Sequence, residues 1–137
     1  MRKTTARKSA GAGKTLQTKP ERSPEYKVEG HIWIDGGEGD FLGVGRVTLL
    51  EMIRETGSIT KAARAIKMSY RRAWEHVESM NRQSASPLVT ASVGGRGGGG
   101  ASLTEAGESA IKAFRGLDER FRAFREREQG RIRITGC

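Results

Sequence analysis

Residues 57–81 have the sequence GSITKAARAIKMSYRRAWEHVESMN and contain two helical patterns separated by two residues. Ser58 and Ser69 stand directly before the two patterns, where a serine hydroxyl can accept a hydrogen bond from a free backbone amide and so cap a helix. Lys67 and Met68 lie between the patterns and leave room for a tight turn only. Two short helices joined in this way are typical of a helix-turn-helix, whose second helix enters the major groove of DNA.

The second helix of this pair has two different faces. Tyr70, Trp74 and Val77 recur at intervals of four and three and point one way, so we expect the two aromatic side chains in the core. The opposite face and its flanks are polar and carry Arg71, Arg72, Glu75, His76 and Ser79. Arginine can contact guanine and glutamate can accept from cytosine, so this face is suited to reading bases. The alternative is an ordinary solvated face with Arg–Glu pairs within the helix.

The flanking segments predict the other parts of a winged helix-turn-helix. A helix is expected over residues 45–56, where apolar residues follow helical spacing and Gly57 is a plausible end. Before it, HIWIDGG at residues 31–37 alternates large apolar and other residues, which predicts a short strand and a glycine-rich turn. After the pair, LVTASV at residues 88–93 has the β-branched content of a strand, and GGRGGGG follows at residues 94–100. These two segments predict a hairpin with a long flexible tip.

The tip of this hairpin combines six glycines with the single cation Arg96. Glycine lets a backbone lie close to another surface, and an arginine placed there is suited to a DNA minor groove. A soluble hairpin that makes no contact is the alternative. The glycines also fit the dinucleotide-binding pattern G-x-G-x-x-G, which we reject because a second strand–helix–strand unit is missing and the next helix starts too late.

A long last helix is predicted from about residue 104 to residue 129, with Thr104 as its N-cap. Apolar residues within it recur at intervals of four and three and form a seam that charged residues flank. A helix of this length reaches about 37 Å and outreaches so small a core, so we predict a two-fold dimer joined through it. Packing of the seam on its own domain is the alternative. The seam residues are Ala110, Phe114, Leu117, Phe121 and Phe124.

Charge divides the 137 residues into two parts. The net charge is +9, and residues 1–27 contribute +6 of it with eight Lys or Arg and two acids. These residues include almost no large apolar side chain, so we expect a disordered basic arm that either attracts phosphates or only keeps the protein in solution. Residues 28–130 then form one winged helix-turn-helix domain, mainly α with a small β component, and residues 131–137 form a short extension.

Several classes of protein are disfavoured by what the sequence lacks. His31 and His76 stand in separate elements without paired acids or cysteines at metal spacing, so we expect neither an enzyme nor a metal or cofactor site. Cys137 is the single cysteine, which excludes an internal disulfide and favours a reducing compartment. No apolar run approaches the roughly 20 residues of a membrane span, and residues 1–30 lack the continuous apolar segment of a secretory signal. We therefore expect a cytoplasmic protein without membrane contact.

The segments FLGVGRVTLLEMIRETGSITKAARAIKMSYRRAWEHVESMN (residues 41–81) and GGRGGGGASLTEAG (residues 94–107) resemble the N-terminal DNA-binding domain of ModE-type molybdate-responsive regulators. The resemblance covers about residues 28–128, and the chain is more distantly similar to LysR-type regulators. It implies a bacterial repressor or activator that dimerises through terminal helices and reads palindromic operators. One departure is Lys67, where relatives often have glycine, so a less sharp turn is expected there.

The resemblance also has a limit that concerns the effector. Regulators of this family carry C-terminal β-barrel modules that bind molybdate or tungstate, whereas this sequence stops soon after the long helix. We therefore expect no molybdate binding by this chain.

The sequence as a whole predicts a homodimeric, sequence-specific transcriptional regulator that binds double-stranded DNA. A non-specific architectural protein, whose basic arm supplies most of the affinity, is the first alternative, and a protein-interaction module is the second. The predicted DNA contacts are Ser58, Thr60, Lys61, Ser69, Tyr70, Arg71, Arg72, Glu75, His76 and Arg96.

Overall fold

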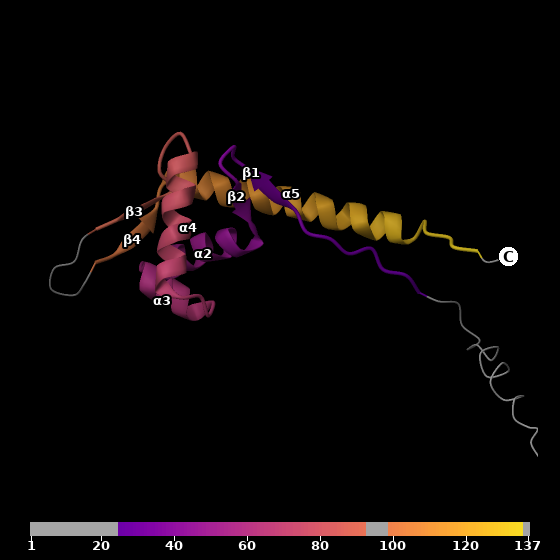
Figure 1. Cartoon of the computed structure of the whole chain (residues 1–137), viewed down its shortest axis with the longest axis horizontal. Helices are drawn as coiled ribbons and strands as arrows, with labels where there is room; N and C mark the ends of the chain where they lie inside the picture. Colours follow the sequence, from indigo (N-terminus) through magenta and orange to yellow (C-terminus); the bar gives the residue numbers. More distant parts are fainter. Residues whose placement is uncertain (1–24, 93–98, 136–137) are drawn as a thin grey trace, which may run out of the picture.

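The computed structural model describes residues 25–92 and 99–135, which form a mainly helical domain with two small antiparallel hairpins (Figure 1). Residues 1–24 of the predicted arm lie outside the described residues, as do residues 93–98 and Cys137. Within the part described, no helix combines the length and the apolar composition needed to cross a bilayer. In chain order the elements are β1 (Trp33–Asp35), β2 (Asp40–Gly43), α2 (Val44–Thr56), α3 (Ile59–Ala65), α4 (Tyr70–Gln83), β3 (Val89–Ala91), β4 (Ala101–Leu103) and α5 (Glu105–Gln129).

Local chemistry sets the helix ends where the sequence places them. Gly57 ends α2 in the left-handed conformation with φ 69°, and its amide donates to the carbonyl of Ile53. Each of the three predicted N-cap hydroxyls accepts a hydrogen bond from an amide in the first turn of its helix, which confirms those predictions. The pairs are Ser58 with Lys61 (3.0 Å), Ser69 with Arg72 (3.1 Å) and Thr104 with Gly107 (3.0 Å).

The turn between α3 and α4 is sharper than we expected. Lys67 adopts a left-handed backbone with φ 59°, the conformation that a glycine would take at lower cost. The expectation of a relaxed turn was therefore wrong. The Met68 amide donates to the Ala63 carbonyl at 2.9 Å, and this hydrogen bond closes the tight turn that orients α4 across α3. The strain at Lys67, about 1–2 kcal/mol, is thus retained in the folded domain.

The core surrounds α2, from which Val47, Leu49, Leu50 and Ile53 are fully buried. The buried face of α4 consists of Ala73, Val77 and Met80, spaced by four and three. Our prediction that Tyr70 belongs to the core was wrong, because its side chain is 53% exposed. Trp74 is half-buried and packs at the edge of the core. The small Ala73 takes the position nearest the neighbouring helices and leaves the two aromatic residues at the margin.

The hairpin β1–β2 lies over the start of α2. The predicted strand at residues 31–37 is present as β1, and its partner β2 was not anticipated. Ile32 and Ile34 pack against the core, whereas Trp33 is 58% exposed, as the alternating pattern requires. The hairpin therefore covers one end of the core.

The wing hairpin pairs β3 with β4 antiparallel, with Val89 opposite Leu103. Asn81 of α4 holds this hairpin: its side-chain oxygen accepts from the amides of Leu88 (2.8 Å) and Val89 (3.1 Å), and its NH₂ group donates to the Val89 carbonyl (2.9 Å). On the other strand, the Ala101 amide donates to the carbonyl of Gly57 at 2.9 Å. The base of the wing is thus fixed to α4 and to the α2–α3 junction.

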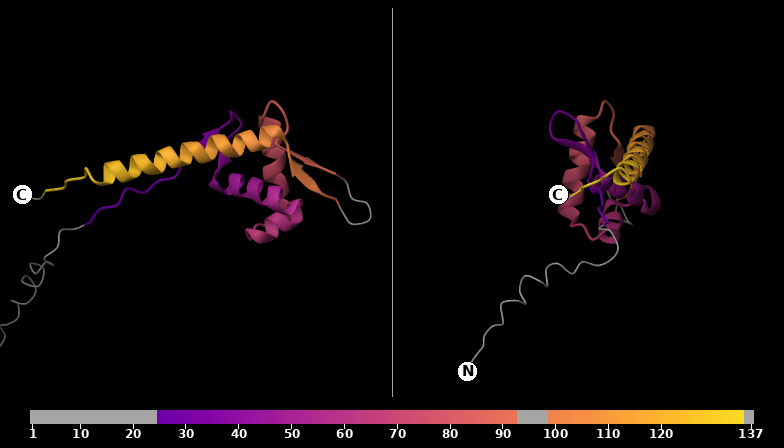
Figure 2. Two further views of the ribbon diagram at one scale, coloured as in Figure 1. Left: turned by 180° about the vertical axis from the view of Figure 1, so that it is seen from behind. Right: turned by 90° about the vertical axis from the view of Figure 1, so that its right-hand side faces the viewer.

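The long helix α5 divides into a packed half and a projecting half (Figure 2). Ile111 and Phe114 are buried in the core, and Arg115 donates two hydrogen bonds to the Glu51 carboxylate of α2 at 2.7 and 2.9 Å. The N-terminal segment, residues 25–30, runs along the projecting half. Its Val28 amide donates to the side-chain oxygen of Gln129 at 3.1 Å.

The predicted seam does not run along α5 as one surface. Phe114 is fully buried in its own domain, which corrects its expected place facing a second chain, and Ala110 packs beside it. Leu117 and Phe121 are half-buried, and Phe124 is 45% exposed. The domain ends part-way along α5, so residues of equal spacing meet different surroundings.

Gly107 allows α5 to pack directly against the backbone of Leu88, just before β3, and we expect Gly107→Ala to lower the free energy of unfolding by about 1–3 kcal/mol. An added Cβ would overlap the backbone carbonyl oxygen of Leu88, which cannot move without shifting the wing. Urea unfolding followed by circular dichroism measures the change. Gly45→Ala is the matched control, because a Cβ at this α2 position meets nothing within 4 Å and should stabilise by about 0.5 kcal/mol. Equal midpoints for the two variants would contradict the prediction.

Candidate nucleic-acid interface

The first turn of α4 presents two arginines to solvent. The Arg71 side chain is 88% exposed, and its Nε lies 3.2 Å from a carboxylate oxygen of Glu75, one turn further along the helix. An exposed pair of this kind contributes about 0.3–0.5 kcal/mol, so Arg71 can exchange Glu75 for another acceptor at little cost. Arg72 is exposed and forms no ion pair with the described residues. Both cations are therefore free to contact a partner.

Arg46 of α2 engages the other side of the polar face of α4. Its Nε donates to Nδ1 of His76 at 3.1 Å, and its Nη1 donates to the hydroxyl of Ser79 at 3.1 Å. The same guanidinium also donates to the backbone carbonyl of Asp40 in the hairpin. The expectation that Ser79 faces outward with Arg72, and that His76 flanks this face, therefore needs correction, because the domain itself contacts both side chains. Arg46 joins the hairpin, α2 and α4 at one point.

The pKa of His76 is lowered below its usual value, and we expect this shift to make stability depend on pH. Burial is the main cause, the cations of Arg46 and Arg72 add to it, and Glu75 opposes them. The folded protein keeps His76 neutral at pH values where an unfolded histidine, with a pKa of about 6.5, binds a proton. The free energy of unfolding should therefore be highest above about pH 6.5 and fall as the pH drops. Thermal unfolding from pH 7.5 to 5 measures the slope.

The control for this prediction is His76→Asn, whose side-chain oxygen can still accept from Arg46 but does not titrate. The variant should show a smaller dependence of stability on pH in the same range. Identical slopes for the two proteins would contradict the role of His76. Glu51, whose pKa is lowered chiefly by the hydrogen bonds from Arg115, affects only a more acidic range.

The start of α3 lies beside the start of α4. Thr60 and Lys61 are exposed, and Ser58 is half-buried with its oxygen occupied as the N-cap of α3. Ser69 is likewise occupied as the N-cap of α4. Of the predicted contacts, the structure brings Ser58, Thr60 and Tyr70 together around one pocket. Arg96 lies in residues 93–98, outside the described part of the chain.

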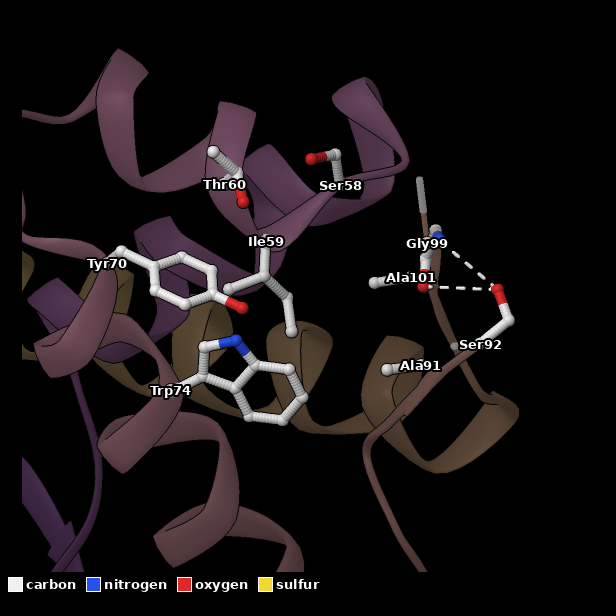
Figure 3. A pocket seen from close by; sticks show the side chains of 10 residues that line it. Ser58, Ile59, Thr60, Tyr70, Trp74, Ala91, Ser92, Gly99 and Ala101 are labelled. Carbon is white, nitrogen blue, oxygen red and sulfur yellow. Dashed lines mark hydrogen bonds between the residues drawn. The ribbon is translucent and has the colours of Figure 1, made fainter. Parts of the chain in front are cut away.

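A pocket of about 340 Å³ separates these helix starts from the base of the wing (Figure 3). Ile59 and Trp74 form its inner wall, and Ala91, Ser92 and Ala101 form the side that belongs to the wing. Tyr70 stands at its rim with its ring in an edge-to-face arrangement with Trp74, the centroids being 6.2 Å apart. On the wing side, the Gly100 amide donates to the Ser92 hydroxyl at 3.1 Å. The pocket therefore lies at the first turn of α4, the turn that also carries Arg71.

The comparison with protein families accounts for this arrangement. Residues 45–108, which span α2 to the start of α5, match the family described as bacterial regulatory helix-turn-helix proteins of the LysR family. The chain carries a LysR-family helix-turn-helix domain. In this DNA-binding domain α3 and α4 are the helix pair, and β3 and β4 form the wing. The family is one of regulators and not of enzymes, as the sequence predicted.

Three relatives are similar to part of this chain. The molybdenum-pterin-binding protein MopB of Rhodobacter capsulatus is 49% identical over 80 residues, which cover 58% of this chain and 30% of the relative. The molybdenum transport protein ModE of Azotobacter vinelandii is 36% identical over 104 residues, which cover 75% of this chain and 38% of the relative. The transcriptional regulator ModE of Haemophilus influenzae is 42% identical over 74 residues, which cover 54% of this chain and 29% of the relative. The chain thus spans about a third of the length of these relatives, and its resemblance to ModE-type regulators is confirmed.

Neither Arg46 nor the pocket was found from the sequence. Arg46 is an isolated cation near the start of an apolar helix pattern, and nothing nearby in the chain indicates that it reaches His76 thirty residues later. Trp74 was interpreted as core only, although its polar edge lines a pocket of the LysR-family domain. The sequence offered no signal for this difference, because Tyr70 and Trp74 have the same helical spacing as the core residue Val77. Among the described residues, no group of three His, Cys, Asp or Glu side chains is arranged to hold a metal ion.

Proposed function

We propose that the protein is a sequence-specific transcriptional regulator that binds palindromic operator DNA as a homodimer. The observation that carries this proposal is the exposed first turn of α4, where Arg71 and Arg72 project from a helix-turn-helix domain beside its wing. Arginine at the start of a recognition helix forms bidentate contacts to guanine, and each such contact contributes about 1–3 kcal/mol of base discrimination. The similarity to the transcriptional regulator ModE of Haemophilus influenzae favours a role in regulation over a role in packaging DNA.

The projecting half of α5 supports the homodimer. Phe121 and Phe124 stack there with centroids 6.4 Å apart, and Phe124 remains 45% exposed. A second copy of the same helix would cover this apolar surface and place two recognition helices on one duplex. Half-sites about one helical turn apart follow from such two-fold symmetry.

Selection of bound duplexes from a random pool tests the proposed function. We expect an enriched palindrome whose affinity exceeds that of random duplex by at least about 10³-fold at physiological salt. Equal affinities for selected and random duplexes would refute sequence-specific regulation.

Deletion of residues 1–27 separates a regulator from an architectural protein, since this segment carries +6 of the net charge of +9. A regulator without the segment keeps its preference for the selected site. An architectural protein instead loses most of its affinity and most of its salt dependence.

A further inference from the structure

The pocket between the two helix starts and the base of the wing is chemically unlike the arginine surface beside it. Its lining contains no Asp, Glu, Lys or Arg. The inner wall is apolar, because the Ile59 side chain, which is 5% exposed, and the ring of Trp74 form it. Ala91 and Ala101 extend the apolar wall to the wing. The occupant of such a pocket has to combine an apolar face with hydrogen-bond acceptors.

Three hydrogen-bonding groups without a partner surround this apolar wall. They are the hydroxyls of Thr60 and Tyr70 and the indole N–H of Trp74, and none of them is hydrogen-bonded to another residue that the structure describes. Figure 3 shows the Tyr70 hydroxyl and the Trp74 nitrogen pointing into the space beside Ile59, with the Thr60 hydroxyl above it. The hydroxyls of Ser58 and Ser92 differ, since they already bond to the backbone. The indole N–H can only donate, and the two hydroxyls can donate as well.

We propose that this pocket holds one phosphodiester of the DNA backbone, with its deoxyribose lying on Ile59 and Trp74 and its oxygens accepting from Thr60, Tyr70 and Trp74. The inference rests on the proposed function and deepens it. A phosphodiester supplies acceptors only, and the carbons of the attached sugar supply the apolar face. The absence of carboxylates from the lining removes a source of repulsion. The pocket also lies at the first turn of α4, the turn that carries Arg71 and Arg72.

This assignment gives the two parts of the interface different tasks. Contacts to phosphate fix the register and orientation of a protein on the duplex but do not depend on base sequence. Thr60, Tyr70 and Trp74 would therefore position α4, while Arg71 and Arg72 read bases. Because the three donors are neutral, they release no counterion of their own, so their loss should leave the salt dependence of binding unchanged.

The test measures the affinity of Tyr70→Phe for the selected operator and for random duplex. The substitution removes one hydroxyl that has no partner in the described chain, so the fold is preserved. We expect both affinities to fall by the same factor, about tenfold, with an unchanged salt slope. Thr60→Val should behave in the same way. Tyr26→Phe is the matched control, because this exposed tyrosine lies on the N-terminal segment, and it should leave both affinities unchanged.

Single methylphosphonate replacements in the operator locate the contact. One position per half-site should weaken the wild-type complex, and the same replacement should have little further effect on Tyr70→Phe. Replacement of a thymine by deoxyuridine removes the thymine methyl. If Tyr70→Phe were coupled to this replacement and not to any methylphosphonate, Tyr70 would read a base, and the inference would be overturned. Inorganic phosphate that quenches Trp74 fluorescence, without any methylphosphonate coupling, would overturn it in favour of a free-anion site.

The outcomes for the pocket and for the proposed function are distinguishable. A wild-type protein that prefers no duplex refutes the regulator itself. A wild-type protein that selects an operator while Tyr70→Phe binds it normally refutes only the assignment of the pocket.

Discussion

Replacement of both Arg71 and Arg72 by alanine should lower the affinity for the selected operator by about 10³-fold and bring it to the affinity for random duplex. Each arginine that contacts a guanine contributes about 1–3 kcal/mol of discrimination, and both side chains are exposed at the start of α4. The single Arg72→Ala variant should relax base preference at one position of each half-site. Fluorescence anisotropy with selected and random duplexes measures these changes.

Arg131→Ala/Arg133→Ala is the control for this double variant, because it removes the same charge beyond the far end of α5 (Figure 1). Arg131 resembles Arg71 in forming an exposed ion pair, here with Glu128 at 3.1 Å. The control should retain its preference for the operator. If the Arg71/Arg72 variant bound the operator as tightly as wild type, α4 would not read DNA, and a protein-interaction module would be the better interpretation.

Phe114→Ala should lower the free energy of unfolding by about 3–5 kcal/mol, the largest stability loss we expect for a single truncation. The Phe114 ring is fully buried between α5 and the core around α2, so its removal leaves a cavity that the rigid helices cannot close. Chemical denaturation of the variant and of wild type at equal protein concentration measures the loss.

Phe124→Ala gives the matching test of the projecting half of α5. Its ring is 45% exposed and stacks on Phe121, so truncation should leave the stability of a single chain nearly unchanged. The same change should weaken the proposed dimer, which sedimentation equilibrium detects as a higher dissociation constant. A dimer unaffected by Phe124→Ala would place the two-fold contact elsewhere.

The element order could be predicted because each signal acts over a few neighbouring residues. Ser58, Ser69 and Thr104 cap the helices that follow them, and a cap bonds to an amide only three residues away. Gly57 ends α2 through its own left-handed backbone. The partner strand β2 was missed, because Asp40–Gly43 is short and has no alternating pattern of its own.

The surface at the start of α4 could be predicted in composition but not in detail. Arg71 and Arg72 are exposed, as the helical periodicity indicated. The same periodicity placed His76 outward, whereas Arg46 approaches it from another helix. The spacing of residues along a helix determines in which direction each side chain points about the helix axis. It does not determine which other helix packs against that side.

Residues 41–107 alone were sufficient to indicate the family, the helix pair, the end of α2 at Gly57 and the starts of α3, α4 and α5, since these depend on residue identity and on bonds between near neighbours. Packing decided the rest. The close approach of the helices buries Ala73 and leaves Tyr70 at the rim of a pocket, and the end of the domain part-way along α5 buries Phe114 but exposes Phe124. Residues with equivalent spacing diverge in this way because burial depends on segments that are distant in the chain and meet only in the folded domain.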